Sequence, residues 1–443
     1  MVPGWIILLV SVLLCSFEST LADPALRSPV ILVPGLAGSV LEGKLNRTEA
    51  PAWYCAKKTD NFRVLWLSLS EASRPTCLLD ELALFYNETT GRYRNQTGVE
   101  IRALDFGGLG GVDALDPGLP RLTPLYSGLT KAFKDEGYKE RKDLFGAPYD
   151  FRLAGDGLEQ VGYYKNLTAL IEHAVDSNDG RQATIVAHSL GCLVSLYFIT
   201  QQPSEWLQKH VNSFVAISAP WAGSITALKG SISGDNFDIP VIPQNLLRPV
   251  QSTAPSGPWL FPTPDQWMDD VLVTTDEKNY TANDALQLLK DLNLTQQAAV
   301  YPKVHDLTYP LLQVDIRVHC LYGTGQDTDE GYVYAVPHFN ASAPPPPKEV
   351  RTGLGDGTVN LRSLEACTAL GETATLKSFH GASHMGILSD DRLIDEVIQI
   401  VKGSKSGAWT DLKSRVRKPW GFLQQLWGVD VYRGVSKAAS WVL

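Results

Sequence analysis

The sequence predicts an α/β fold, in which helices cover the faces of a mostly parallel β-sheet. Two observations support this prediction: short apolar segments of the buried-strand type recur along the chain, and segments with helical spacing alternate with them. No internal repeat is present. With 443 residues, 44% of them hydrophobic and 20% charged, the chain can form one large domain with insertions and a substantial core.

The alternation begins near residue 29. The segment 29–43 starts as an apolar strand and breaks at Pro34-Gly35 into a glycine-containing turn, and 131–152 contains a helix end, a loop and a second strand. Residues 163–180 have the apolar spacing of an amphipathic helix that ends at Asn-Asp-Gly. The later elements are a strand at 183–189, a helix at 190–203, strands at 211–223, 315–325 and 373–379, and a final helix at 390–403.

Two stretches interrupt this alternation. Residues 46–120 contain two cysteines and much glycine, whereas 224–312 contain many prolines and have weak periodicity. We interpret both as insertions on the core, the second as a cap and lid. The run Ala-Ser-Ala-Pro-Pro-Pro-Pro at 341–347 predicts a stiff, exposed excursion.

The first 22 residues resemble a signal peptide. The apolar run from Trp5 to Cys15 is too short to span a bilayer comfortably, and Thr20-Leu21-Ala22 has the small-residue pattern of a cleavage site. The segment before the apolar run has no Lys or Arg, so a signal anchor is the alternative. We predict cleavage after Ala22 and entry into the secretory pathway, with the extracellular space or a lysosomal or vacuolar lumen as destination.

Export would place the remaining cysteines in an oxidising compartment. These are Cys55, Cys77, Cys192, Cys320 and Cys367, an odd number, so that four can form two disulfides with three possible connectivities. Pairing of sequence neighbours is the simplest choice and leaves Cys192 free. Seven Asn-x-Ser/Thr sequons also favour export and a glycosylated surface: Asn46, Asn87, Asn95, Asn166, Asn279, Asn293 and Asn340.

Charge separates the C-terminal segment, residues 404–443, from the rest of the chain. The whole chain has a formal net charge of -9, which argues against a nucleic-acid partner. The tail is instead rich in Lys and Arg, and it contains Trp409, Trp420, Trp427 and Trp441. This composition is typical of a segment on an anionic membrane surface, although packing on the core or plain disorder would also accommodate it.

Ser189 is the candidate nucleophile. It lies in Ala187-His188-Ser189-Leu190-Gly191, between a predicted strand and a predicted helix, where α/β-hydrolases have the Gly-x-Ser-x-Gly nucleophile elbow. The turn requires small residues at both glycine positions, and alanine can serve at 187. A structural serine at a strand–helix turn is the alternative.

A serine requires a base and an acid to become nucleophilic, and in this fold they follow it in the order acid, then histidine. His380 and His384 both lie between the last strand and the last helix, and spacing favours His384. We interpret His188, whose side chain should point the other way on an extended segment, as structural support. Asp327 directly follows a strand, and Asp356 lies between glycines, so the residues alone do not separate the two carboxylates.

The oxyanion of the reaction needs two backbone N–H donors. Leu190 follows the nucleophile, and Leu36 lies in the glycine-containing turn after the first strand. No group of His and Cys has the spacing of a metal site, so we predict neither a metal nor an organic cofactor.

Taken together with these candidate residues, the motifs of the sequence resemble those of the family of lecithin–cholesterol acyltransferase and lysosomal phospholipase A2. The resemblance covers most of residues 28–402 and rests on ILVPGLAGSVLEGKL, WYCAKKTDNFRVLWLSL, GAPYDFR, AHSLGCLVSLYF, ISAPWAGS, SGDNFDIPVI, NYTANDALQLLKDL, VHCLYGTG and GDGTVNLRSLEAC, in this order.

The resemblance implies an α/β-hydrolase core at 28–403 with a membrane-binding insertion at 46–100, a cap and lid insertion at 224–312 and a mobile lid at 233–259. It implies the acid Asp356, the base His384 and the oxyanion donor Leu36. It also implies the disulfides Cys55–Cys77 and Cys320–Cys367, the first closing a membrane-binding loop around Trp66, which would contact membrane or substrate.

Family members move an acyl group from a glycerophospholipid of a membrane or lipoprotein surface onto the serine. The acyl group then passes to a lipid alcohol, such as a sterol or a ceramide-like alcohol, or to water. The chain departs from the family pattern at Leu36, at Ala222 and in its tail, whereas Cys192 matches a free cysteine of the lecithin–cholesterol branch. A neutral-lipid esterase or lipase, and an inactive lipid-binding protein of the same fold, are the alternative functions.

Overall fold

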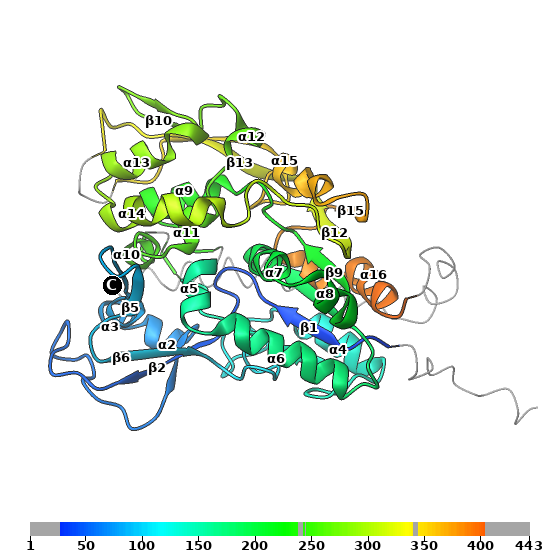
Figure 1. The fold of residues 1–443 in the computed structure, drawn as a ribbon. Helices are drawn as coiled ribbons and strands as arrows, with labels where there is room; N and C mark the ends of the chain where they lie inside the picture. The colour runs from blue at the N-terminus through cyan, green and yellow to red at the C-terminus, as the bar shows by residue number, and fades with distance from the viewer. Residues whose placement is uncertain (1–26, 238–241, 244, 340–343, 404–443) are drawn as a thin grey trace, which may run out of the picture. The chain divides into compact units, whose positions relative to one another are not determined.

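The computed structural model describes residues 27–237, 242–243, 245–339 and 344–403. Within these residues the central element is a parallel sheet of six strands in the order β15-β12-β9-β8-β1-β7 (Figure 1). The strands are β1 (Val30–Val33), β7 (Leu144–Gly146), β8 (Ala183–His188), β9 (Val211–Ile217), β12 (Arg317–Thr324) and β15 (Ala374–His380). The predicted α/β core is therefore confirmed.

Both faces of the inner strands of this sheet are covered, which explains why β1 and β8 are almost continuously apolar, whereas the edge strand β15 is mostly exposed. In β1 all four residues are fully buried, and alternate side chains enter different cores. Ile31 and Val33 pack with residues of α6 (Tyr163–Asp176), α7 (Leu190–Thr200) and α8 (Ser204–His210). Val30 and Leu32 pack with residues of α4 (Ser127–Asp135) and α16 (Asp391–Val401).

The first predicted insertion, at 46–120, contains a hairpin and two strands of a three-stranded antiparallel sheet in the order β3-β2-β6, whose central strand β2 (Leu41–Leu45) lies just before the insertion. The elements of the insertion are β3 (Arg63–Trp66), α2 (Leu69–Ala72), α3 (Pro75–Leu82), β4 (Leu84–Asn87), β5 (Arg92–Asn95) and β6 (Val99–Ala103). The disulfide Cys55–Cys77 joins the loop after β2 to α3.

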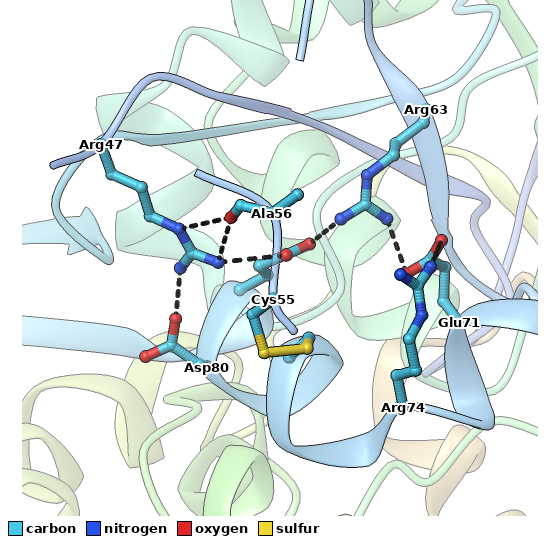
Figure 2. Close-up of a disulfide and its surroundings, with 9 residues drawn as sticks. Arg47, Cys55, Ala56, Arg63, Glu71, Arg74 and Asp80 are labelled. Carbon is cyan, nitrogen blue, oxygen red and sulfur yellow. Dashed lines mark hydrogen bonds and ion pairs between the residues drawn. A yellow bond between two sulfur atoms is a disulfide. The ribbon is translucent and has the colours of Figure 1, made fainter. Parts of the chain in front are cut away.

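An ionic cluster lies beside this disulfide (Figure 2). The Arg47 guanidinium contacts Asp80 at 2.5 Å and Glu81 at 3.4 Å, and Arg63 contacts Glu81 at 2.5 Å and Glu71 at 2.9 Å. Burial raises the pKa of Glu81, against the opposing effect of Arg63 and Arg47. The cluster therefore joins the loop before the disulfide to β3 and α3.

The second predicted insertion contains several short helices around its own apolar core, which includes Trp267, Leu289 and Tyr332. The helices are α9 (Ile225–Ile232), α10 (Arg248–Gln251), α11 (Ser256–Trp259), α12 (Pro264–Trp267), η2 (Ala282–Asp284), α13 (Ala285–Asp291), α14 (Thr295–Val304) and η3 (His305–Leu307). Figure 1 shows α9, α11, α13 and α14 grouped together, and α9 packs against α10, α11 and β13.

A second sheet, in the order β11-β10-β13-β14, completes this part of the molecule. Its strands are β10 (Val273–Thr274), β11 (Asn279–Tyr280), β13 (Gln326–Val333) and β14 (Glu349–Gly355), and the antiparallel pair β13–β14 was not predicted. The chain then forms α15 (Leu361–Glu365), η4 (Ala366–Leu370) and η5 (Gly386–Ser389), besides the short α5 (Gly155–Gln160). Cys320 of β12 is bonded to Cys367 of η4.

Some predictions fall outside the described residues, namely the signal peptide at 1–22 and the basic tail at 404–443. Among the described helices, none has both the length and the apolar character required to cross a membrane. The sequon asparagines Asn46, Asn87, Asn166, Asn279 and Asn293 are exposed, and Asn95 is half-buried.

Candidate active site

The corner at residues 187–191 holds Ser189 in a strained backbone conformation. Ser189 follows β8 directly and is the N-cap of α7, with φ 53° and ψ -128°, a positive φ that is unusual for a residue with a Cβ atom. The helix also runs close to β1, since a Cβ atom on Gly191 would lie 2.4 Å from the Pro34 carbonyl oxygen. Ala187 occupies the other glycine position of the motif. It is fully buried, and the pairing of β8 with β9 is regular at this residue.

Three of the predicted residues form a continuous hydrogen-bonded chain. His384 Nε2 lies 2.9 Å from Ser189 Oγ, and His384 Nδ1 lies 2.8 Å from Asp356 Oδ2. His384 comes from the loop between β15 and η5, as expected, and its backbone N–H donates to the Asp356 carbonyl at 2.7 Å. All three residues are buried.

Asp356 is placed by the unpredicted strand β14, which ends one residue before it. Its Oδ1 accepts hydrogen bonds from the backbone N–H groups of Val359 at 2.8 Å and Thr358 at 3.1 Å. Burial alone would raise the pKa of Asp356, but His384 and these two N–H donors lower it below its usual value. Although glycines flank it on both sides, Asp356 is fully buried.

The two rival candidates lie elsewhere. Asp327 is the second residue of β13, paired with Leu354, and is exposed rather than in a loop after β12. His380 is the last residue of β15 and is also exposed. Neither makes a hydrogen bond to Ser189 or His384 within the described residues.

His188 does not point away from the site. Its ring centroid lies 4.9 Å from that of His384, and its Nε2 donates to the His384 carbonyl oxygen at 2.9 Å. Burial, together with the nearby His384, lowers the pKa of His188 to about 3, so that the ring is neutral at physiological pH. His188 thus holds the backbone of His384 by a hydrogen bond. The alternating direction of side chains along a strand did not predict this contact.

The turn after β1 supplies a second backbone N–H group next to Ser189. Gly38 N–H donates to the Gly35 carbonyl at 3.0 Å, with Leu36 between them, and a Cβ atom on Gly35 would lie 2.8 Å from Ser189 Cβ. Within the described residues, the N–H groups of Leu36 and Leu190 donate to no protein acceptor. The absence of a protein acceptor for either N–H group, among the described residues, is what the predicted role as oxyanion donors requires.

A cavity of about 250 Å³ opens beside Ser189 and His384. Much of its lining is apolar: Trp66 and Leu82 come from the first insertion, Phe237, Leu247 and Val250 from the cap, and Phe151 from the loop after β7. Three of its charged lining residues, Lys229, Asp235 and Asp329, had no signal in the sequence, because they come from α9, the segment after it and β13, none of which was predicted.

Trp66 lines this cavity and does not face solvent. Its side chain is only 2% exposed, its ring packs against Phe151 and Phe237, and its Nε1 donates to the Ala37 carbonyl at 2.7 Å. The prediction of a membrane contact for Trp66 is therefore wrong, whereas its place allows contact with substrate. The two residues directly before Cys55 are instead exposed, Trp53 at 96% and Tyr54 at 45%.

Cys192 is a free, fully buried thiol on the first turn of α7. Its Sγ lies 3.7 Å from the Ile217 carbonyl oxygen, and burial raises the pKa of the thiol well above its usual value, with only a partial opposing effect of that carbonyl contact. The thiol is therefore held in its unreactive form. Among the residues that the structure describes, no group of three or more His, Cys, Asp and Glu side chains could hold a metal ion.

Comparisons with known proteins agree with this geometry. A family model described as lecithin:cholesterol acyltransferase matches residues 61–308 and 303–389. The chain is 34% identical to a bovine (Bos taurus) protein named "Lysosomal phospholipase A and acyltransferase", over 88% of this chain and 99% of that protein. It is 32% identical to a human protein named "Phosphatidylcholine-sterol acyltransferase", over 85% of each chain.

A solved structure described as "The crystal structure of Tle4-Tli4 complex" shares the fold, with a TM-score of 0.50 and 12% sequence identity over 85% of this chain and 99% of that one. The match to the family model spans most of the described residues, and the sequence identities extend over nearly the whole length of the relatives. The chain belongs to the lecithin:cholesterol acyltransferase family.

Proposed function

We propose that the protein is a serine-dependent acyl hydrolase and O-acyltransferase that cleaves a fatty acyl ester of a glycerophospholipid. The observation that carries the proposal is the hydrogen-bonded chain from Asp356 through His384 to Ser189, beside a largely apolar cavity. The names of the bovine and human relatives, a phospholipase A and acyltransferase and a phosphatidylcholine-sterol acyltransferase, support the substrate class.

In the first half-reaction, Ser189 Oγ attacks the carbonyl carbon of the acyl ester while His384 Nε2 accepts the hydroxyl proton. Asp356 keeps His384 Nδ1 protonated and stabilises the imidazolium that forms. The N–H groups of Leu36 and Leu190 would hold the oxyanion of the tetrahedral intermediate, each such donor contributing about 3 kcal/mol. The ester C–O bond then breaks, the lysophospholipid oxygen takes the proton from His384, and the acyl group remains on Ser189.

In the second half-reaction, a hydroxyl group attacks the acyl-serine with the same residues in reversed order. His384 takes the proton from water or from a lipid alcohol such as a sterol or a ceramide-like alcohol, and it returns the proton to Ser189 Oγ. The largely apolar lining of the cavity favours a lipid alcohol over water as the acyl acceptor, because apolar side chains exclude water from the acyl-enzyme.

We also propose that the protein acts at a phospholipid membrane or lipoprotein surface, with Trp53 and Tyr54 as contacts. Both aromatic side chains are exposed in a loop that the disulfide Cys55–Cys77 and the ion pair Arg47–Asp80 hold in place. Tryptophan and tyrosine are favoured at membrane interfaces, because the apolar part of each ring contacts lipid while its N–H or O–H group stays in water. The basic tail at 404–443 remains a predicted second contact.

For the compartment we propose the secretory pathway, with the extracellular space or a lysosomal or vacuolar lumen as destination. The predicted signal peptide, the two disulfides and the exposed sequon asparagines support this proposal.

The function is tested by incubating the purified protein with phosphatidylcholine, a sterol and a ceramide and identifying the acyl products. We expect lysophospholipid together with free fatty acid or an acylated alcohol, and we expect Ser189→Ala to abolish all of them. Faster cleavage of triglyceride than of phosphatidylcholine would favour a neutral-lipid lipase instead. Unchanged turnover in the Ser189→Ala variant would reject the catalytic assignment.

A further inference from the structure

An open groove lies on the surface beside α6, and we call it the α6 groove. Its volume is about 340 Å³, within the range of roughly 300–1,000 Å³ that is typical of pockets for small ligands. None of its lining residues also lines the cavity beside Ser189. The reaction proposed for Ser189 therefore gives this groove no role.

One wall of the α6 groove is a stripe of side chains along the helix. Asn166, Leu170 and His173 follow one another at intervals of four and three residues, which places them on the same side of α6, and Ala169 lines the groove with them. Asn166, Ala169 and His173 are exposed, and Leu170 is half-buried. A ligand can therefore reach this wall along its whole length.

The opposite wall comes from Phe106 and Gly107, which follow β6, and from Arg141, which precedes β7. The Gly107 N–H group donates to the Gly146 carbonyl at 2.8 Å, which holds this wall on β7. A Cβ atom on Gly107 would lie 3.6 Å from Leu170 Cδ1 and 3.7 Å from Arg141 Nη1. The backbone of Gly107 thus lies between these two side chains, and the groove is already formed.

The chemistry of the α6 groove is apolar along its walls and cationic at its rim. Phe106 is half-buried, with its ring packed against Tyr163 at 6.0 Å between centroids, and Leu170 faces it across Gly107. The exposed Arg141 guanidinium pairs with Asp105 through one nitrogen and has further N–H donors. A pyranose ring matches this arrangement, because its faces carry C–H groups and its edge carries hydroxyl groups.

Asn166 is positioned to place a sugar at this groove. Asn166-Leu167-Thr168 is a sequon, and the Asn166 side chain makes no hydrogen bond to the residues that the structure describes. The sequon asparagine Asn95 differs, because its Oδ1 accepts from Arg152 at 2.7 Å. Since Asn166 itself is part of the lining, a glycan attached to it starts inside the α6 groove.

We propose that Asn166 carries an N-linked glycan whose first sugar residues bind in the α6 groove. The apolar faces of the rings lie on Leu170 and Phe106, and Arg141 donates to the sugar oxygens. The covalent link raises the effective concentration of the sugar to the millimolar range, so that a weak site is enough to hold it. The inference goes beyond the proposed reaction and rests only on the proposed secretory compartment, where N-linked glycans are added.

The test measures how fast a peptide-N-glycosidase releases each glycan from the native protein. The enzyme leaves an aspartate at the released site, which mass spectrometry detects. Asn87 and Asn279 are the reference sites, because both are exposed and neither lines the groove. We expect release at Asn166 to be about tenfold slower than at these sites, because only the undocked fraction of the glycan is cleaved. After unfolding, the three sites should be released alike.

Two variants separate the groove from the helix that carries the glycan. Leu170→Ala and Arg141→Gln each remove one contact with the sugar, and each should raise native release at Asn166 toward the rate of the reference sites. Lys165→Ala is the matched control, because Lys165 is exposed next to Asn166 on the same helix and does not line the groove. It should leave the rate unchanged. Thermal unfolding shows that each variant is folded.

The proposal is overturned if Asn166 carries no glycan, or if native release at Asn166 is as fast as at Asn87 and Asn279. It is also overturned if slow release persists in both groove variants, because the helix itself would then obstruct the glycosidase. Failure of the proposed function is a different result, since Ser189→Ala should carry the same glycans whatever its activity. A protein without glycan at any sequon would reject the proposed compartment together with this inference.

Discussion

Replacing Asp356 by asparagine should disable His384 without disturbing its position. In the structure Asp356 Oδ1 accepts from the N–H groups of Thr358 and Val359, at 3.1 and 2.8 Å, and Oδ2 faces His384 Nδ1 at 2.8 Å. The two N–H donors select the amide oxygen for the Oδ1 position, so the amide NH₂ group must face Nδ1. Nδ1 then becomes an acceptor, the proton moves to Nε2, and Nε2 can no longer take the proton of Ser189.

The size of the effect follows from the alternative amide orientation. Turning the amide to restore the correct tautomer would set its NH₂ group against two buried N–H donors, and each lost acceptor costs about 1–3 kcal/mol. The wrong tautomer is therefore favoured, and a loss of about 10⁴-fold in kcat is expected, as for the same replacement in other serine triads. This corresponds to about 5.4 kcal/mol of activation free energy.

The assay is release of fatty acid from phosphatidylcholine micelles, together with the rate at which a fluorophosphonate labels Ser189. Asp327→Asn is the control, because it makes the same change at the exposed rival carboxylate of β13. It should retain full activity. If Asp356→Asn keeps more than a tenth of the wild-type rate while its thermal unfolding is unchanged, the role given to Asp356 is wrong.

Three further predictions concern the surface, the neighbouring histidine and the free thiol. Trp53→Ala combined with Tyr54→Ala should weaken binding to phosphatidylcholine vesicles about tenfold and leave hydrolysis of a soluble ester unchanged, whereas Val161→Ala, at a position that is 62% exposed, should do neither. His188 has a pKa of about 3 in the folded protein, against 6.5 as the reference value, so the unfolded chain binds the extra proton between these values. The contribution of His188 to the free energy of unfolding should therefore be complete above about pH 6.5 and should fall as the pH drops toward 3. His188→Asn should reduce this dependence of stability on pH in thermal unfolding measured across that range. An equal pH dependence in both proteins would contradict the assignment. Cys192 should react with a thiol reagent only after unfolding, and Cys192→Ala should keep kcat within about threefold; rapid labelling of the native protein would show that the thiol is accessible.

The inner strands β1 and β8 of the central sheet could be predicted because their apolar character is nearly continuous. Val30 to Val33 are buried on both faces, as are Ala183 to His188, and such segments stand out from the amphipathic helices between them. Ser189 could be located for the same reason, since its corner joins one of these strands to a helix.

The acid could not be separated from its rival by the residues alone. Asp356 follows β14, of which only Gly355 is buried, so the strand lacks the apolar pattern that marks the central sheet. Asp327 seemed to follow a strand, but the chain continues into β13 after Gly325, and no local signal marks this bend. The resemblance to the family, rather than periodicity, selected Asp356.

The contacts of Trp66 and His188 depend on tertiary packing and could not be predicted from the sequence. An apolar run around Trp66 is equally compatible with a membrane surface and with a cavity wall, and the choice depends on Phe151 and Phe237, which are distant in the chain. The charged group of Lys229, Asp235 and Asp329 joins α9, the segment after it and β13, so no spacing in the sequence reveals it.

The most direct test of the account is to trap the acyl-enzyme. The protein is mixed with phosphatidylcholine, quenched in acid within the first turnovers and digested, and the peptide that contains Ser189 is examined by mass spectrometry. The account predicts one acyl group, of the mass of the substrate's fatty acid, on Ser189 in the wild-type protein and none in Ser189→Ala. An acyl group on another residue, or phospholipid turnover without any acylated Ser189, would contradict it.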